Sequence, residues 1–186
     1  MNIFRISGKF IKFGVRNSKN KNGELKVRGV IRKTEYAAAE NDAKEIIRRG
    51  EYGVLSTMSA DGYPYGVPLS YWYKDDVIYF HCAKEGHKLD NIKADNRVSF
   101  CVVGKNENII GDFTANYEST VIFGKAYEVT GSEKEEAMLE MVKRFSPDFM
   151  EQGKAAIKRA DPKLSVYKIV AEQVTGKIKN TPPKAK

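Results

Sequence analysis

The sequence is poor in cysteine and histidine, and this scarcity excludes several kinds of site. Its two cysteines, Cys82 and Cys101, lie in separate strand-like runs without CxxC spacing. They argue against a disulfide framework and for a reducing compartment such as the cytoplasm. The two histidines, His81 and His87, and the scattered acidic residues make no recognisable set of metal ligands. No Ser, Cys or Thr stands in a nucleophile motif such as GxSxG. We therefore expect no metal site, and any redox chemistry would come from a cofactor.

Long apolar runs are also absent. No stretch approaches the roughly 18 apolar residues that a membrane-spanning helix needs. The first residues contain no continuous apolar block of the kind found in a secretory signal. We therefore expect no membrane partner.

The positive charge of the chain is concentrated at one end. The net charge is +8, and eight of the 32 basic residues but only one of the 24 acidic ones lie in residues 1–28. The rest of the chain is close to neutral. No Lys or Arg occurs between Glu51 and Tyr73, whereas nucleic-acid-binding faces interleave aromatic residues with positive charge. These features argue against a nucleic-acid partner, and a tether formed by the basic leader is the alternative.

The chain divides into three parts. Residues 1–28 mix Lys, Asn and Gly with scattered apolar residues and show no sustained period, so we expect a disordered leader. Residues 29–178 are long enough to form one domain with a real core. Residues 179–186 are rich in Pro and Lys, and we expect a disordered tail.

The domain alternates strand-like and helical segments. Asp61-Gly62 between two strand-like runs predicts a hairpin whose second strand extends from Tyr63 to Tyr73. Ser132 and Glu135 have the spacing of a capping box at the start of an amphipathic helix. We expect further strands at 77–82, 97–103, 113–129 and 164–174, and helices at 41–50, 86–94, 132–144 and 149–159. The pattern is mainly β with flanking helices (α+β) and indicates a small antiparallel barrel.

The second hairpin strand has two unlike faces. Tyr65, Val67, Leu69, Tyr71 and Tyr73 alternate with small residues and form a core-like face. The opposite face is nearly flat, and its proline cannot donate to a β-ladder, so pairing must lapse there at an edge or a gap. A flat surface of this kind could receive a planar heterocycle, or it could simply lie at a barrel corner.

Residues 77–92 contain the strongest local signal. A buried strand turns through Gly86 into a helix that begins with His87 and Lys88. Free backbone N–H groups, the positive end of the helix dipole and an ammonium suit a phosphate. The alternative is an ordinary strand–turn–helix with a solvated lysine. His81, in the apolar strand, is more typical of a core histidine.

Several motifs along the chain occur in a familiar order. They are Gly53-Val-Leu-Ser-Thr, Asp61-Gly-Tyr-Pro-Tyr-Gly-Val-Pro-Leu-Ser-Tyr, Ile78-Tyr-Phe-His-Cys-Ala-Lys-Glu-Gly-His-Lys-Leu-Asp and Val98-Ser-Phe-Cys-Val-Val. In this order they resemble the pyridoxamine 5′-phosphate oxidase-related FMN-binding split-barrel family, and within it the 5-nitroimidazole antibiotic resistance branch. Later segments, including the closing Val174-Thr-Gly-Lys177, agree with this resemblance.

The resemblance implies a split β-barrel that binds FMN at the interface of a homodimer. Lys88 then carries over as a ligand of the FMN phosphate, and His87 stands where the oxidases have arginine. His87 is also the candidate catalytic residue. The oxidases carry cations around the strand that matches 67–73, and their absence here argues against pyridoxamine phosphate as substrate. The cofactor-binding residues implied are Val67, Pro68, Leu69, Ser70, His81, Cys82, Ala83, Gly86, His87 and Lys88.

The activity implied is that of an FMN-dependent oxidoreductase. It would pass electrons from NADH or NADPH to a small acceptor such as a nitroaromatic. The alternatives are a flavin- or haem-binding protein without turnover and, in third place, a nucleic-acid binder that uses the basic leader.

Overall fold

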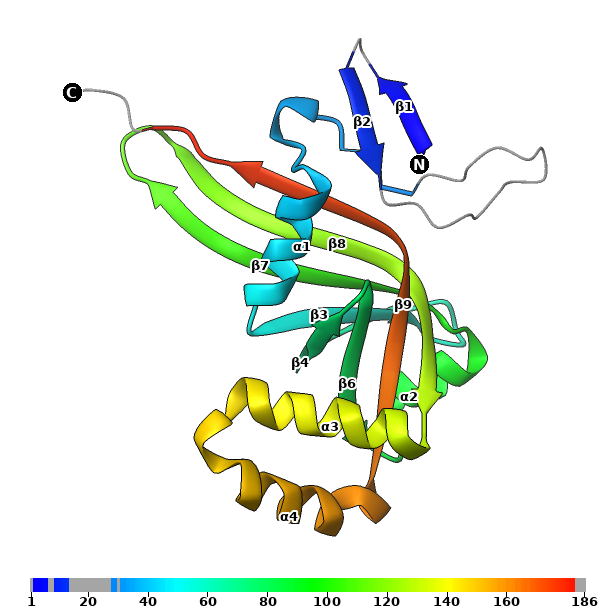
Figure 1. The fold of residues 1–186 in the computed structure, drawn as a ribbon. Coiled ribbons are helices and arrows are strands. Elements are labelled where there is room, and N and C mark those ends of the chain that lie inside the picture. Colours follow the sequence, from blue (N-terminus) through cyan, green and yellow to red (C-terminus); the bar gives the residue numbers. More distant parts are fainter. Residues whose placement is uncertain (1, 7–8, 14–27, 30, 183–186) are drawn as a thin grey trace. The chain divides into compact units, whose positions relative to one another are not determined.

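The computed structural model describes residues 2–6, 9–13, 28–29 and 31–182 (Figure 1). The described residues fall into two compact units. The first unit takes the described residues within 1–53, 99–123 and 172–186, and the second comprises 54–98 and 124–171.

The main sheet has seven strands in the order β4-β3-β7-β8-β9-β6-β5. The pairings of β6 with β5 and with β9 are both antiparallel. The mainly β fold with flanking helices that the sequence predicts is confirmed. The strands are β3 (Tyr52–Met58), β4 (Pro64–Ser70), β5 (Trp72–Lys74), β6 (Val77–Ala83), β7 (Arg97–Ile109), β8 (Thr114–Val129) and β9 (Leu164–Lys179).

The hairpin of β3 and β4 forms at the predicted Asp-Gly turn. Gly62 has φ 87°, which glycine adopts without strain. The Ser59 N–H donates to the Tyr63 carbonyl at 2.9 Å and closes the turn. The single long strand predicted for 63–73 is wrong, because the chain leaves the β-ladder at Tyr71. Although β4 and β5 are separated only by Tyr71 in sequence, they lie at opposite ends of the strand order.

Burial alternates along β4 and β5 in the way that the two predicted faces require. Tyr71 and Tyr73 are buried, whereas Gly66, Pro68 and Ser70 are exposed. Pro68 lies in an edge strand, where its missing N–H removes no bond from an inner ladder.

The helices of the second unit are α2 (His87–Ala94), α3 (Gly131–Phe145) and α4 (Met150–Ala160). The helix α3 contacts β5, β6 and α4. The predicted capping box is wrong, because α3 begins at Gly131 after Thr130 and no side chain caps it. The buried face of α3 forms one apolar cluster with residues of β8 and β9, and its members are Val129, Ala137, Met138, Met141 and Val166.

The first unit packs α1 (Glu40–Arg49) against parts of β8 and β9. Ile46 and Ile47 are fully buried, and the Thr120 hydroxyl donates to the Ala43 carbonyl at 3.0 Å. A Cβ at Gly176 would lie 2.6 Å from the Ala43 Cβ. Glycine therefore permits this close approach of helix and strand.

The structure describes parts of both ends of the chain, for which the sequence predicts disorder. Within the leader, β1 (Asn2–Ile6) and β2 (Lys9–Phe13) pair in antiparallel fashion. Arg28, the last leader residue, pairs with Glu172 of β9 at 3.1 Å. At the other end Lys179 is still in β9, and the Thr181 N–H donates to the Asn116 side chain at 2.8 Å. Residues 14–27 and 183–186 lie outside the described part of the chain.

Tyr71 generates a prediction about alkaline stability. Burial raises the pKa of Tyr71 to about 12, although nearby Arg144 opposes the rise. The folded state therefore holds this proton more tightly than the unfolded state, whose tyrosines have a pKa near 10. The stability that neutral Tyr71 contributes is complete below pH 10 and is lost as the pH rises from about 10 to 12.

The free energy of unfolding should accordingly fall less between pH 8 and pH 11 in Tyr71→Phe than in the unsubstituted chain. Urea unfolding at the two pH values measures this difference. Tyr63→Phe is the control, because the Tyr63 ring is exposed. Equal losses in the two variants would contradict the prediction.

Candidate functional site

The turn from β6 into α2 presents backbone donors. Gly86 precedes the helix with φ 131°, and a Cβ there would meet no atom within 4 Å. No side chain caps the helix start. The Leu89 and Asp90 N–H groups donate to the Gly86 carbonyl at 2.8 and 3.2 Å. The N–H groups of His87 and Lys88 come before the first intrahelical bonds and can serve a ligand.

Lys88 supplies the positive charge at this turn. Its side chain is half-buried, and it forms no ion pair with any residue that the structure describes. It lies close enough to Cys82 to affect the thiol. Burial raises the pKa of the Cys82 thiol, and the charge of Lys88 opposes this rise. An uncapped helix start with an unpaired ammonium fits the phosphate of a cofactor.

His87 is held by a polar cluster that the sequence reasoning did not identify. Its Nε2 lies 2.8 Å from the Ser59 hydroxyl. The buried Asn91 amide donates to Ser59 Oγ at 3.3 Å and to Thr57 Oγ1 at 3.0 Å. The Tyr65 ring meets the His87 ring edge-on, with centroids 4.7 Å apart. The sequence could have indicated this cluster, because Asn91 lies on the inward face of α2, four residues after His87.

The cluster predicts a proton position on His87. Because the Asn91 amide donates to Ser59 Oγ, the Ser59 hydroxyl proton is free to point at His87 Nε2. We predict that Nε2 accepts this bond and that the ring proton lies on Nδ1. His87 is exposed, so this N–H can donate to a ligand.

The predicted residues of β4 divide between its two faces. Pro68 and Ser70 are exposed, whereas Val67 and Leu69 are half-buried on the other side. A planar ligand on the exposed face would meet the Ser70 hydroxyl and the Pro68 ring directly. It would meet Val67 and Leu69 mainly through their backbone. Tyr65 links this strand to α2 by its contact with His87.

The predicted residues of β6 divide in the same way. His81 and Ala83 are exposed, and Cys82 is buried. The expectation of a core histidine at 81 is wrong, because Phe80 and Cys82 occupy the inward positions of a strand with a period of two. His81 Nδ1 lies 3.4 Å from Met141 Sδ of α3. Although the residue is exposed, desolvation of its ring lowers the pKa of His81.

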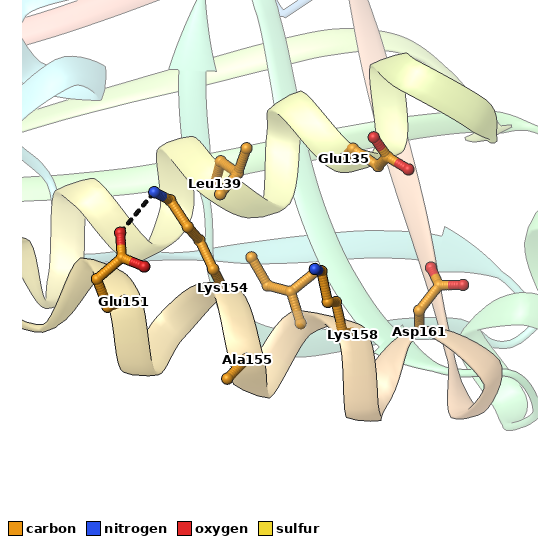
Figure 2. Close-up of a pocket in the computed structure, with 8 residues that line it drawn as sticks. Glu135, Leu139, Glu151, Lys154, Ala155, Lys158 and Asp161 are labelled. Atoms are coloured by element: carbon orange, nitrogen blue, oxygen red, sulfur yellow. Dashed lines mark hydrogen bonds and ion pairs between the residues drawn. The ribbon is translucent and has the colours of Figure 1, made fainter.

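Other kinds of site find no support in the described part of the chain. It contains no group of three or more His, Cys, Asp or Glu that could hold a metal ion. Within the same residues, no helix has the length and apolar character needed to cross a membrane. A groove of about 620 Å³ between α3 and α4 contains none of the predicted site residues (Figure 2).

The polar cluster predicts a tautomer that NMR can detect. Ser59→Ala removes the partner of His87 Nε2, so the proton should shift from Nδ1 toward Nε2. The chain has two histidines, and long-range ¹H–¹⁵N spectra of His81 and His87 can therefore be separated. Ser70→Ala, which removes an exposed hydroxyl from β4, is the control. An unchanged His87 spectrum in Ser59→Ala would show that the bond does not set the tautomer.

Comparisons with known proteins agree with the sequence motifs. The profile of the family described as pyridoxamine 5′-phosphate oxidase matches residues 39–178. No curated protein matches the sequence of this chain. A similar structure is that of the flavocytochrome Anf3 from Azotobacter vinelandii, with TM-score 0.70 and 17% identity over 90% of this chain and 78% of that one.

Two further structures are similar. A candidate 5-nitroimidazole antibiotic resistance protein from Bacteroides thetaiotaomicron has TM-score 0.56 and 20% identity, over 76% of this chain and 86% of that one. A FAD- and haem-binding protein from Mycobacterium smegmatis has TM-score 0.63 and 12% identity, over 80% of this chain and 75% of that one. These likenesses confirm the predicted split-barrel fold. Because the family profile covers most of the sequence, the chain belongs to the pyridoxamine 5′-phosphate oxidase family.

Proposed function

We propose that the protein is an FMN-dependent reductase of small acceptors such as nitroaromatics. The observation that carries the proposal is the start of α2, where half-buried Lys88 has no ion-pair partner among the described residues and no side chain caps the helix. The phosphate of FMN would lie there, held by Lys88 and the backbone at Gly86 and His87. Similarity to a FAD- and haem-binding protein supports a flavin site in this fold.

The isoalloxazine ring would lie along β4. The edge position of this strand leaves one side without a neighbouring strand among the described residues. The backbone of Val67 to Ser70 can therefore contact polar atoms at the ring edge, and the Ser70 hydroxyl can add a hydrogen bond. We assign His81, Cys82 and Ala83 to the same ring, with Cys82 acting through its backbone because its side chain is buried.

FMN, once bound, supplies hydride transfer, and the protein supplies binding and electrostatics. The chain's own contribution to the reaction is the donor on His87 Nδ1, which can bind the phosphate or an anionic group of the acceptor. We propose a homodimer with the cofactor at its interface, as the family resemblance implies. The cysteines of the described residues are both free, which suits the reducing cytoplasm.

The second candidate is a flavin- or haem-binding protein without turnover. The exposed ring of His81 favours it, because desolvation keeps this imidazole neutral and a neutral imidazole can ligate haem iron. Two of the similar structures are a flavocytochrome and a FAD- and haem-binding protein. Absorbance after addition of haem separates the candidates, since haem ligation by His81 would give a Soret shift that His81→Ala abolishes.

Removal of the lysine charge should weaken FMN binding. In Lys88→Ala the dissociation constant of FMN should rise about 10- to 100-fold, because charge-assisted contacts to phosphate contribute about 1.5–3 kcal/mol. Flavin fluorescence titration measures the change. Lys93→Ala is the matched control, as Lys93 is an exposed lysine in the last turn of the same helix. Unchanged FMN affinity in Lys88→Ala would refute the phosphate assignment.

Turnover is tested separately with the FMN-loaded protein. Under anaerobic conditions it should oxidise NADH or NADPH when a nitroaromatic is added, and absorbance at 340 nm follows the reaction. Loss of this activity with retained FMN in His87→Ala would assign His87 to the acceptor side. FMN binding without nicotinamide oxidation across a panel of acceptors would favour the non-catalytic candidate.

A further inference from the structure

A hollow of about 500 Å³ opens in the first unit. Side chains of one face of β8 form part of its lining, and β9 and the segment before α1 contribute the rest. Its volume lies in the range of small-molecule sites. Its lining includes Arg32, Lys33, Tyr117, Ser119, Phe123 and Lys177.

The charges that line this hollow are all positive. Arg32, Lys33 and Lys177 contribute three cations, and the lining contains no Asp or Glu. None of the three forms an ion pair with a residue that the structure describes. Unbalanced cations around a concave surface attract anions, because the hollow focuses their field.

The groove between α3 and α4 shows the opposite arrangement (Figure 2). It contains charges of both signs, and Lys154 pairs with Glu151 at 2.6 Å. Asp161 of the same groove pairs with Lys134 at 2.7 Å. Its charges are thus largely balanced within the protein, whereas those of the hollow in the first unit are not.

Three ammonium groups gather at one ring beside the hollow. Lys33, Lys177 and Lys179 lie 5.6, 6.0 and 5.9 Å from the centroid of Tyr36. Lys177 also lies 5.2 Å from the centroid of Tyr117. Cation–π attraction favours each contact, but the like charges repel one another, and a bound anion would relieve this repulsion.

The remaining lining suits a flat, partly apolar group. Tyr117, Val121 and Phe123 alternate along β8 and are half-buried on one face. Ser119, between them on the same face, makes no hydrogen bond to a described residue. Aromatic rings, short apolar side chains and an available hydroxyl together match a planar heterocycle that has polar atoms at its edge.

We propose that this hollow binds a small aromatic anion of the size of a nucleoside monophosphate. Arg32, Lys33 and Lys177 would hold the negative group, and Tyr117 and Phe123 would contact the planar part. The inference does not depend on FMN binding at α2, since it uses none of the residues assigned to that site.

Isothermal titration of the full chain with adenosine 5′-monophosphate tests the proposal. We expect saturable binding that weakens about tenfold in Lys177→Met and in Arg32→Ala, because each variant removes one charge-assisted contact. Methionine keeps the apolar stem of the lysine, and Arg32 is exposed, so both variants should fold. Circular dichroism verifies this.

Two controls make the result decisive. Lys105→Ala removes one positive charge from β7 of the same unit, outside the hollow, and should leave the affinity unchanged. Lys88→Ala should also leave it unchanged, even though FMN binding is expected to fall. Absence of saturable binding to the unsubstituted chain, or equal losses in Lys177→Met and Lys105→Ala, would overturn the proposal. Loss of binding in Lys88→Ala alone would place the nucleotide at α2 and overturn it too.

Discussion

The interruption of the sheet at Tyr71 is the constraint on which the candidate site depends. If residues 64–74 formed one continuous strand, they would occupy a single position in the strand order. Because the chain leaves the ladder at Tyr71, β4 and β5 become the two terminal strands of the order. Pro68 is compatible with this position, since an edge strand can lack an N–H on its open side. The same edge gives the proposed flavin site its accessible backbone.

Among the described residues, some positive charges are neutralised by a neighbouring carboxylate and others are not. Many surface cations have carboxylate partners, for example Arg97 with Asp95 and Lys168 with Glu133. Lys88 and the cations of the hollow in the first unit have none among the described residues. Surface ion pairs contribute little to stability, so the paired cations need no functional explanation. Lys88 and the cations of the hollow are candidates for ligand binding, because the first lies at an uncapped helix start and the others line a concave surface.

Local patterns in the sequence predicted which helices and strands form better than they predicted where each one begins and ends. The Asp61-Gly62 hairpin and the strand–turn–helix around Gly86 are present, because glycine with positive φ enforces both turns. The capping box at Ser132 failed because the N-cap position is Thr130, so Ser132 already lies within the first turn of the helix. His81 was misplaced because four apolar residues in a row concealed the period of two.

The amino-acid sequence by itself determined the family, the mainly β fold and the residues at the start of α2, since these depend on short-range patterns and motif order. Only the tertiary structure decided that Ser59 reaches both His87 and Asn91, and that Arg32, Lys33 and Lys177 line one hollow. Lys177 is 144 residues distant from Lys33 in sequence. Such residues are brought together by strand pairing and packing, whose register no local pattern records.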